Sequence, residues 1–146
     1  MNNLSELRDE LSKEVDRYFI QKEKNYNCAE TVLTVMSNYF GVDAEIIPSI
    51  AKPFGGGYAS THRFVCGAVS GGVMAIGLKE KKDPAAIARE LLDFVSDKYG
   101  SIVCDEILDI DFDDEEQVAR EKEPKRNTIC YPLLKDICVW VAERLA

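Results

Sequence analysis

Residues 64–78 read Phe-Val-Cys-Gly-Ala-Val-Ser-Gly-Gly-Val-Met-Ala-Ile-Gly-Leu and form the most apolar stretch of the chain. The stretch has 15 residues, whereas a helix that crosses a bilayer needs about 20. We therefore predict a buried helix from about Cys66 to Lys79. Its small residues, among them Gly67 and Gly71, let neighbouring backbones approach closely. This segment predicts the centre of a packed helical fold.

The segments on either side of this helix also show a helical period. Apolar residues near the N-terminus recur at intervals of three and four: Leu4, Leu7, Leu11, Val15 and Tyr18 or Phe19. Asp83-Pro84 is typical of a helix start, and Gly41 and Gly100 are typical of helix ends. The predicted flanking helices are residues 3–23, 26–40, 43–50, 84–99, 101–108 and 127–146.

The fold class that follows is all-α, because no stretch shows sustained β alternation. We expect a single compact bundle-like domain over residues 1–146, with about six or seven helices. A chain of 146 residues is close to the size of one average domain.

The charge of the chain is unevenly distributed. There are 26 acidic and 18 basic residues, a net charge of −8, and residues 105–116 hold eight acidic residues and no basic one. Outside that segment the charges balance. An acidic chain without a basic stripe is not expected to bind nucleic acid. We interpret residues 105–116 as a solvated acidic connector between helices.

The cellular location is predicted from the N-terminus, which is polar and acidic and lacks the apolar segment of an export signal. We expect a cytoplasmic protein without a membrane partner. Thiols stay reduced in that compartment, where cysteine clusters more often indicate redox chemistry or metal binding than structural disulfides. The five cysteines are an odd number, so complete internal pairing is excluded.

Four of the five cysteines lie near predicted helix starts: Cys28, Cys66, Cys104 and Cys130. Unpaired N–H groups and the positive end of the helix dipole there favour a thiolate. The thiolate is the form that attacks disulfides and binds metals. Cys138 differs, since it lies between apolar residues in the middle of a predicted helix, where a cysteine behaves as a small hydrophobe.

A series of spaced motifs extends this grouping: Asn27-Cys28-Ala29-Glu30, Phe54-Gly55-Gly56-Gly57, Cys66-Gly67-Ala68-Val69-Ser70-Gly71, Gly100-Ser101-Ile102-Val103-Cys104 and Cys130-Tyr131-Pro132. From about residue 25 to 140 the chain resembles the redox-active protein family named for its Cys, GCAxxG, Cys, Cys pattern. That family is largely uncharacterised and is called redox-active from its cysteines. The resemblance indicates which four cysteines are functional, but it says little about their chemistry.

Two chemistries fit four such thiols. They could form dithiol/disulfide couples that exchange electrons with a partner, or hold an iron–sulfur cluster or another Cys-ligated metal. The first chemistry is preferred, because the cysteine spacing matches no common metal-binding motif. The cysteines are separated by 38, 38 and 26 residues, so a shared site requires tertiary folding. The chain has no Cys-x-x-Cys-His sequence, and covalent haem is not implied.

Residues around the cysteines are further candidates. Gly55, Gly56, Gly57, Gly67 and Gly71 are predicted to let the backbone approach a cofactor or whatever else Cys66 faces.

Two polar residues precede Cys66. His62, the single histidine, is a candidate ligand or proton shuttle, and its alternative is an ordinary surface residue. Arg63 is a candidate for lowering the pKa of the Cys66 thiol, and its alternative is a solvated charge.

The first hypothesis is a small cytoplasmic redox protein in which Cys28, Cys66, Cys104 and Cys130 converge, framed by the glycine-rich segment 55–72. A redox partner protein is expected. The alternative is a helical structural or interaction protein with buried cysteines and an acidic partner-binding loop. Because no motif defines a substrate, whether the protein is an enzyme stays open, as does its oligomeric state.

Overall fold

The computed structural model describes residues 3–21 and 24–145. Its helices are α1 (Asn3–Val15), the π-helical turn η1 (Asp16–Ile20), α2 (Cys28–Phe40), the 3₁₀ segment η2 (Ser49–Phe54), α3 (Gly67–Lys79), α4 (Pro84–Tyr99), α5 (Cys104–Leu108), α6 (Glu115–Lys125), the π-helical turn η3 (Arg126–Cys130) and α7 (Tyr131–Leu145). The described residues contain no strand, only one isolated bridge between Val65 and Val103. The all-α prediction is confirmed, and seven α-helices are described.

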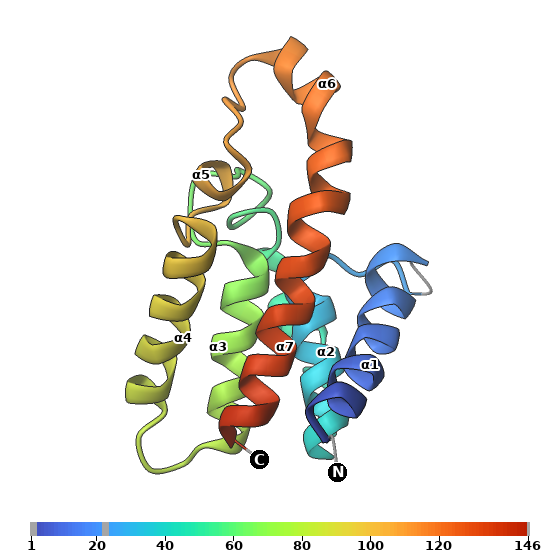
Figure 1. Cartoon of the computed structure of the whole chain (residues 1–146), viewed down its shortest axis with the longest axis vertical. Coiled ribbons are helices and arrows are strands. Elements are labelled where there is room, and N and C mark those ends of the chain that lie inside the picture. Colours follow the sequence, from blue (N-terminus) through green and yellow to red (C-terminus); the bar gives the residue numbers. More distant parts are fainter. Residues whose placement is uncertain (1–2, 22–23, 146) are drawn as a thin grey trace.

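The predicted central helix is α3, which packs on α2, α7 and α4 (Figure 1). Its small residues decide how closely it packs. A Cβ at Gly71 would lie 2.8 Å from the Ala29 carbonyl oxygen of α2, and one at Gly72 would lie 2.8 Å from Ile137 Cγ2 of α7. These glycines therefore give up helix propensity, about 1 kcal/mol each, and permit close helix contacts.

Helix ends follow the local sequence signals in α2 and α4. Asn27 and Glu30 form a reciprocal capping box at the start of α2, and Gly41 ends the helix in the left-handed conformation (φ 70°). Asp83 accepts a hydrogen bond from the Ala86 N–H at the start of α4, and Gly100 ends it with φ 83°. The predicted bounds of both helices are confirmed to within about two residues.

Three short segments differ from the prediction. Residues 43–50 do not form an α-helix; turns lead into η2, since Pro48 lacks an N–H donor and restricts the residue before it. The predicted helix 3–23 becomes α1 followed by η1, and residues 22–23 lie outside the described residues. The helix predicted for 101–108 is shorter and begins at Cys104.

The largest difference lies near the C-terminus. Residues 105–116 were predicted as a connector and 127–146 as a separate helix, but α6, η3 and α7 run on as one helical rod from Glu115 to Leu145 (Figure 1). The helix α6 is not predicted from the sequence, because it buries no residue and so has no apolar stripe, and because it contains Pro124. Asp114 caps its first turn, and Lys125 pairs with Glu121 one turn earlier at 2.8 Å.

Among the described helices, none combines the length and apolar character that crossing a membrane requires.

Candidate functional site

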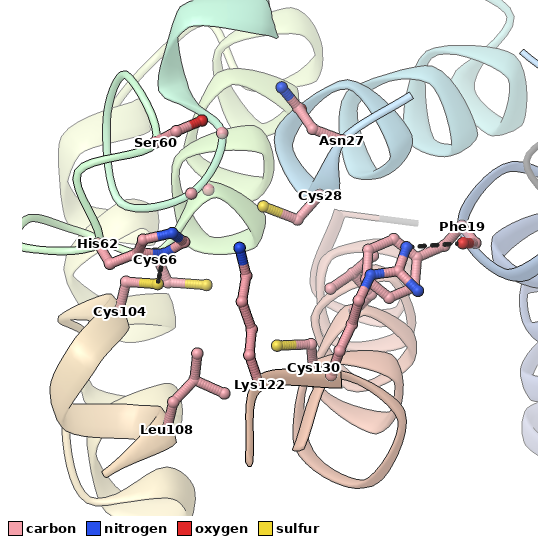
Figure 2. A pocket seen from close by; sticks show the side chains of 15 residues that line it. Phe19, Asn27, Cys28, Ser60, His62, Cys66, Cys104, Leu108, Lys122 and Cys130 are labelled. Carbon is pink, nitrogen blue, oxygen red and sulfur yellow. Dashed lines mark hydrogen bonds between the residues drawn. The ribbon is translucent and has the colours of Figure 1, made fainter. Parts of the chain in front are cut away.

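Four cysteine side chains line a single cavity of about 250 Å³ (Figure 2). They come from four different parts of the chain. Cys28 is the first residue of α2, Cys66 directly precedes α3, Cys104 is the first residue of α5, and Cys130 ends η3. All four are free thiols. The fold thus brings together the four cysteines that the sequence grouped.

Backbone pairing holds two of these cysteines beside each other. The Cys66 N–H donates to the Ile102 carbonyl at 2.8 Å, and the Cys104 N–H donates to the Phe64 carbonyl at 2.9 Å. These bonds flank the bridge between Val65 and Val103. The segments before α3 and α5 therefore run together to the cavity.

The loop after η2 forms another wall and has an unusual backbone. Five successive residues have φ between 51° and 68°: Gly56, Gly57, Tyr58, Ala59 and Ser60. Left-handed backbone costs a non-glycine residue roughly 1–2 kcal/mol. Such strain is typical of functional sites, where surrounding bonds enforce it. Here the His62 N–H donates to the Gly56 carbonyl at 2.7 Å, and the Ala59 N–H donates to the Pro53 carbonyl at 2.7 Å.

The predicted glycines divide into two groups. Gly55, Gly56 and Gly67 line the cavity. A Cβ at Gly67 would overlap Cys28 Sγ, and one at Gly57 would lie 2.7 Å from Cys104 Cβ. Gly71 instead faces the α2 backbone. Gly57 and Gly67 therefore lie directly against cysteines, whereas Gly55 packs on Asn27 and Gly56 on Ser60.

Burial and the nearby backbone together determine the pKa of Cys28. Burial raises the pKa of the Cys28 thiol, and hydrogen bonding by the backbone N–H groups of Gly56, Ala29 and Ala68 acts in the opposite direction without outweighing it. The Gly56 contact links the strained loop to the cysteine at the start of α2. Hydrogen bonds of this kind stabilise a sulfur that carries negative charge.

The other three thiols also have raised pKa values. Burial is the main cause for Cys66, and for Cys104 and Cys130 it raises the pKa to about 12. Repulsion among the ionised sulfurs adds to it; Cys28 acts in this way on each of the other three. The expectation that these thiols have lowered pKa values is wrong, because desolvation raises the pKa of each one.

Cys130 also lies elsewhere than predicted. It is not at a helix start but within the continuous rod from α6 to α7, in the π-helical turn η3. Single π-helical turns inside α-helices are frequent at functional sites.

Two cations in the cavity wall were missed by the sequence analysis. Lys122, Arg126, Cys130 and Leu134 all line the cavity and follow one another at intervals of four residues along the rod. The Cζ atom of Arg126 lies 3.8 Å from the Phe19 ring centroid, and Arg126 Nη2 donates a hydrogen bond to the Phe19 carbonyl oxygen at 2.9 Å. Lys122 extends toward the space between the sulfurs (Figure 2). The four-residue spacing was the signal that could have identified them.

His62 lies at the site. Its Nδ1 is 3.4 Å from Cys104 Sγ, and its ring stacks on Phe112 with the centroids 4.0 Å apart. Burial lowers the pKa of His62, and the charge of Lys122 adds to this effect. The surface alternative for His62 is therefore wrong.

Arg63 and Cys138 lie outside the cavity. The Arg63 guanidinium pairs with Asp113 at 2.6 Å in an exposed ion pair, which favours the solvated interpretation. Cys138 is fully buried in the core, as predicted for a small hydrophobe.

The described side chains include no group of three or more His, Cys, Asp or Glu residues arranged to hold a metal ion as they stand. The sulfurs instead lie around a cavity well above the roughly 10–15 Å³ that one water molecule needs.

Together these features define a helical protein with a cysteine-lined pocket at the ends of its helices. The family model described as "Putative redox-active protein (C_GCAxxG_C_C)" matches residues 26–144, and the chain belongs to this family, as the spaced motifs indicated. No curated protein matches the chain, and no solved structure matches it.

Proposed function

We propose that this protein transfers electrons through an iron–sulfur cluster held by Cys28, Cys66, Cys104 and Cys130. The observation that carries the proposal is the convergence of these four thiols, from four separate segments, on one cavity of about 250 Å³. Four cysteines are the usual ligand set of both [2Fe–2S] and [4Fe–4S] clusters. Such a cluster supplies one-electron transfer.

We propose a cluster and not a single ion because of the space between the four cysteines. A zinc ion draws its sulfur ligands to about 2.3 Å, so its ligands converge on one point. A cluster occupies a volume between its ligands. The N–H groups of Gly56 and Ala68 at Cys28 supply hydrogen bonds to sulfur, which are among the features that set the potential of a cluster.

The raised pKa values also favour metal ligation over simple thiol exchange. Because burial raises the pKa of Cys104 and of Cys130 well above the usual value, little of either thiol is ionised at pH 7. Thiol exchange needs the thiolate. A bound metal supplies the positive charge that deprotonates a coordinating thiol outright, which the protein here does not do by itself.

The chain's own residues have distinct parts in this proposal. The glycine-rich loop and α3 form the wall beside Cys28 and Cys66, while Lys122 and Arg126 place positive charge beside the sulfurs. The cavity is partly open, and a redox partner protein would approach that opening. A cytoplasmic location, where thiols stay reduced, completes the proposal.

The test is anaerobic purification followed by reconstitution with ferrous iron and sulfide, with visible absorption and iron and sulfide analysis. We expect a brown protein. Single replacements of Cys28, Cys66, Cys104 or Cys130 by Ser should reduce or abolish the chromophore. Cys138→Ser is the matched control, because Cys138 is fully buried away from the cavity, and it should retain the chromophore.

A colourless, metal-free protein after reconstitution would overturn the cluster. Counting thiols before and after mild oxidation would then separate the alternatives. Loss of two or four thiols from the cavity set supports a dithiol/disulfide protein. Five unchanged thiols support a helical interaction protein with buried cysteines.

A further inference from the structure

We infer that Lys122 sets the charge of the cysteine pocket and thereby raises the reduction potential of the redox centre held there. The inference rests on the proposed function, since it concerns the same pocket. It assigns a role to a residue of α6 that neither the sequence motifs nor the family pattern includes.

Geometry places this lysine at the sulfurs. Lys122 and Arg126 lie four residues apart, and Cys130 lies four residues further along the same rod. The π-helical turn η3 has about one extra residue per turn relative to an α-helix. Residues four apart, such as Arg126 and Cys130, therefore stay on one face of the rod. All three residues line the cavity, and the Lys122 ammonium points between Cys28 and Cys130 (Figure 2).

The two cations differ in how they are held. Arg126 is fixed by Phe19, through the ring face and the carbonyl oxygen. Lys122 makes no hydrogen bond or ion pair to any residue in the described ranges 3–21 and 24–145. No carboxylate of these described ranges therefore lies within ion-pair distance of it, although the charge of Asp105 opposes its effect on the pKa of His62.

The field of this lysine reaches three groups in the wall. Cys104, Cys130 and His62 line the same cavity as Lys122. A charge with that reach stabilises negative charge anywhere between the sulfurs. Reduction adds one negative charge there, so Lys122 favours the reduced form.

The neighbouring lysine of α6 provides a matched control. Lys125 Nζ donates to the Asp109 carbonyl at 3.1 Å and pairs with Glu121 at 2.8 Å, and it does not line the cavity. Lys122→Gln and Lys125→Gln remove the same charge from the same helix. Lys122→Arg keeps the charge.

The first measurement is the midpoint potential of the reconstituted full chain, followed by visible absorption. Dithionite supplies the electron and ferricyanide removes it. We expect Lys122→Gln to shift the potential downward, Lys122→Arg to restore most of it, and Lys125→Gln to leave it close to the parent value. Equal potentials for Lys122→Gln and Lys125→Gln would overturn the inference.

The second measurement uses the chain without metal, under reducing conditions. Iodoacetate and iodoacetamide both alkylate a thiolate and release iodide, but only iodoacetate is an anion. The ratio of their rates at Cys104 and Cys130, read by peptide mass spectrometry, cancels the fraction of thiolate. We expect Lys122→Gln to lower this ratio by about two- to fivefold at low salt, and Lys125→Gln to leave it unchanged.

The two measurements separate failure of this inference from failure of the proposed function. If the parent chain forms no cluster, the proposed function fails and the role in the potential fails with it, whatever the alkylation ratio. If a cluster forms but neither potential nor ratio responds to Lys122→Gln, the proposed function stands and the inference is wrong.

Discussion

The sulfur of Cys28 packs directly against the backbone of Gly67, so that a Cβ at Gly67 would overlap it. The start of α2 and the start of α3 therefore meet at the cysteine cavity. The contact needs glycine because of space and not because of backbone conformation, since Gly67 does not have a positive φ.

The first prediction concerns this contact. Gly67→Ala should destabilise the protein by about 1–3 kcal/mol, as expected for overpacking, and should impair cluster assembly. Gly77→Ala in the same helix is the control, because a Cβ there meets nothing within 4 Å. It should stabilise the protein by about 0.5–1 kcal/mol through helix propensity. Urea unfolding measures both, and a Gly67→Ala protein as stable as the parent would contradict the prediction.

The part of the site that the sequence predicted is the part carried by local signals. Cys28 and Cys66 follow from recognisable helix starts, and the apolar run around Ala68 predicts a central helix. The rod from Glu115 was missed for a physical reason. Its first helix has no apolar stripe, is stabilised by a cap and by ion pairs, and contains Pro124. Missing that helix hid Lys122 and misplaced Cys130.

The left-handed loop was not predictable for a different reason. Tyr58, Ala59 and Ser60 each disfavour a positive φ, so their intrinsic preferences oppose the observed backbone. Tertiary hydrogen bonds, such as the one from the Ser60 N–H to the Gly55 carbonyl at 3.0 Å, impose it. The position of His62 beside Cys104 depends on this loop and was equally hidden.

The second prediction tests the strain in that loop. Ala59 is exposed and has φ 51°, a conformation that glycine adopts without steric cost. Ala59→Gly should therefore stabilise the protein by about 0.5–1 kcal/mol. Ala119→Gly, at an exposed position of α6, should destabilise its helix by up to about 1 kcal/mol. Opposite signs in chemical denaturation support the strain; a loss of stability in both variants would argue against it.

The third prediction concerns Cys138. Its side chain is fully buried among core residues and away from the cavity, so Cys138→Ala should cost about 1–2 kcal/mol by leaving a small void. Iron content and visible spectrum of the reconstituted protein should stay unchanged. Cys130→Ala, in the cavity wall, should instead lose the chromophore. A fully folded Cys138→Ala protein that binds no iron would contradict the assignment of Cys138 to the core and of the other four cysteines to the site.

The fourth prediction concerns the buried carboxylate of Asp136, which ties three helices together. Tyr99 donates its hydroxyl to Asp136 at 2.5 Å, Lys98 lies 2.8 Å from it, and Arg8 of α1 lies 3.4 Å from it. Burial acts to raise the pKa of Asp136, but the bonds from Lys98 and Tyr99 outweigh burial and the net pKa is lowered. The folded state therefore prefers the ionised carboxylate.

Asp136→Asn should accordingly destabilise the protein at pH 7, by about 1–3 kcal/mol for bonds to a charged group. A carboxyl whose pKa is lowered on folding stabilises the protein above its unfolded pKa of about 3.9, and that contribution is lost as the pH falls through the lower, folded value. Urea unfolding at several pH values should show a constant gap between parent and variant above about pH 5 that narrows in more acidic solution. Asp97→Asn, at an exposed position of α4, should show a small gap throughout. A difference in unfolding free energy between the parent and Asp136→Asn that stays the same down to pH 3 would contradict the prediction. It would mean that the hydrogen bonds at residue 136 stabilise the ionised carboxylate no more than the neutral amide.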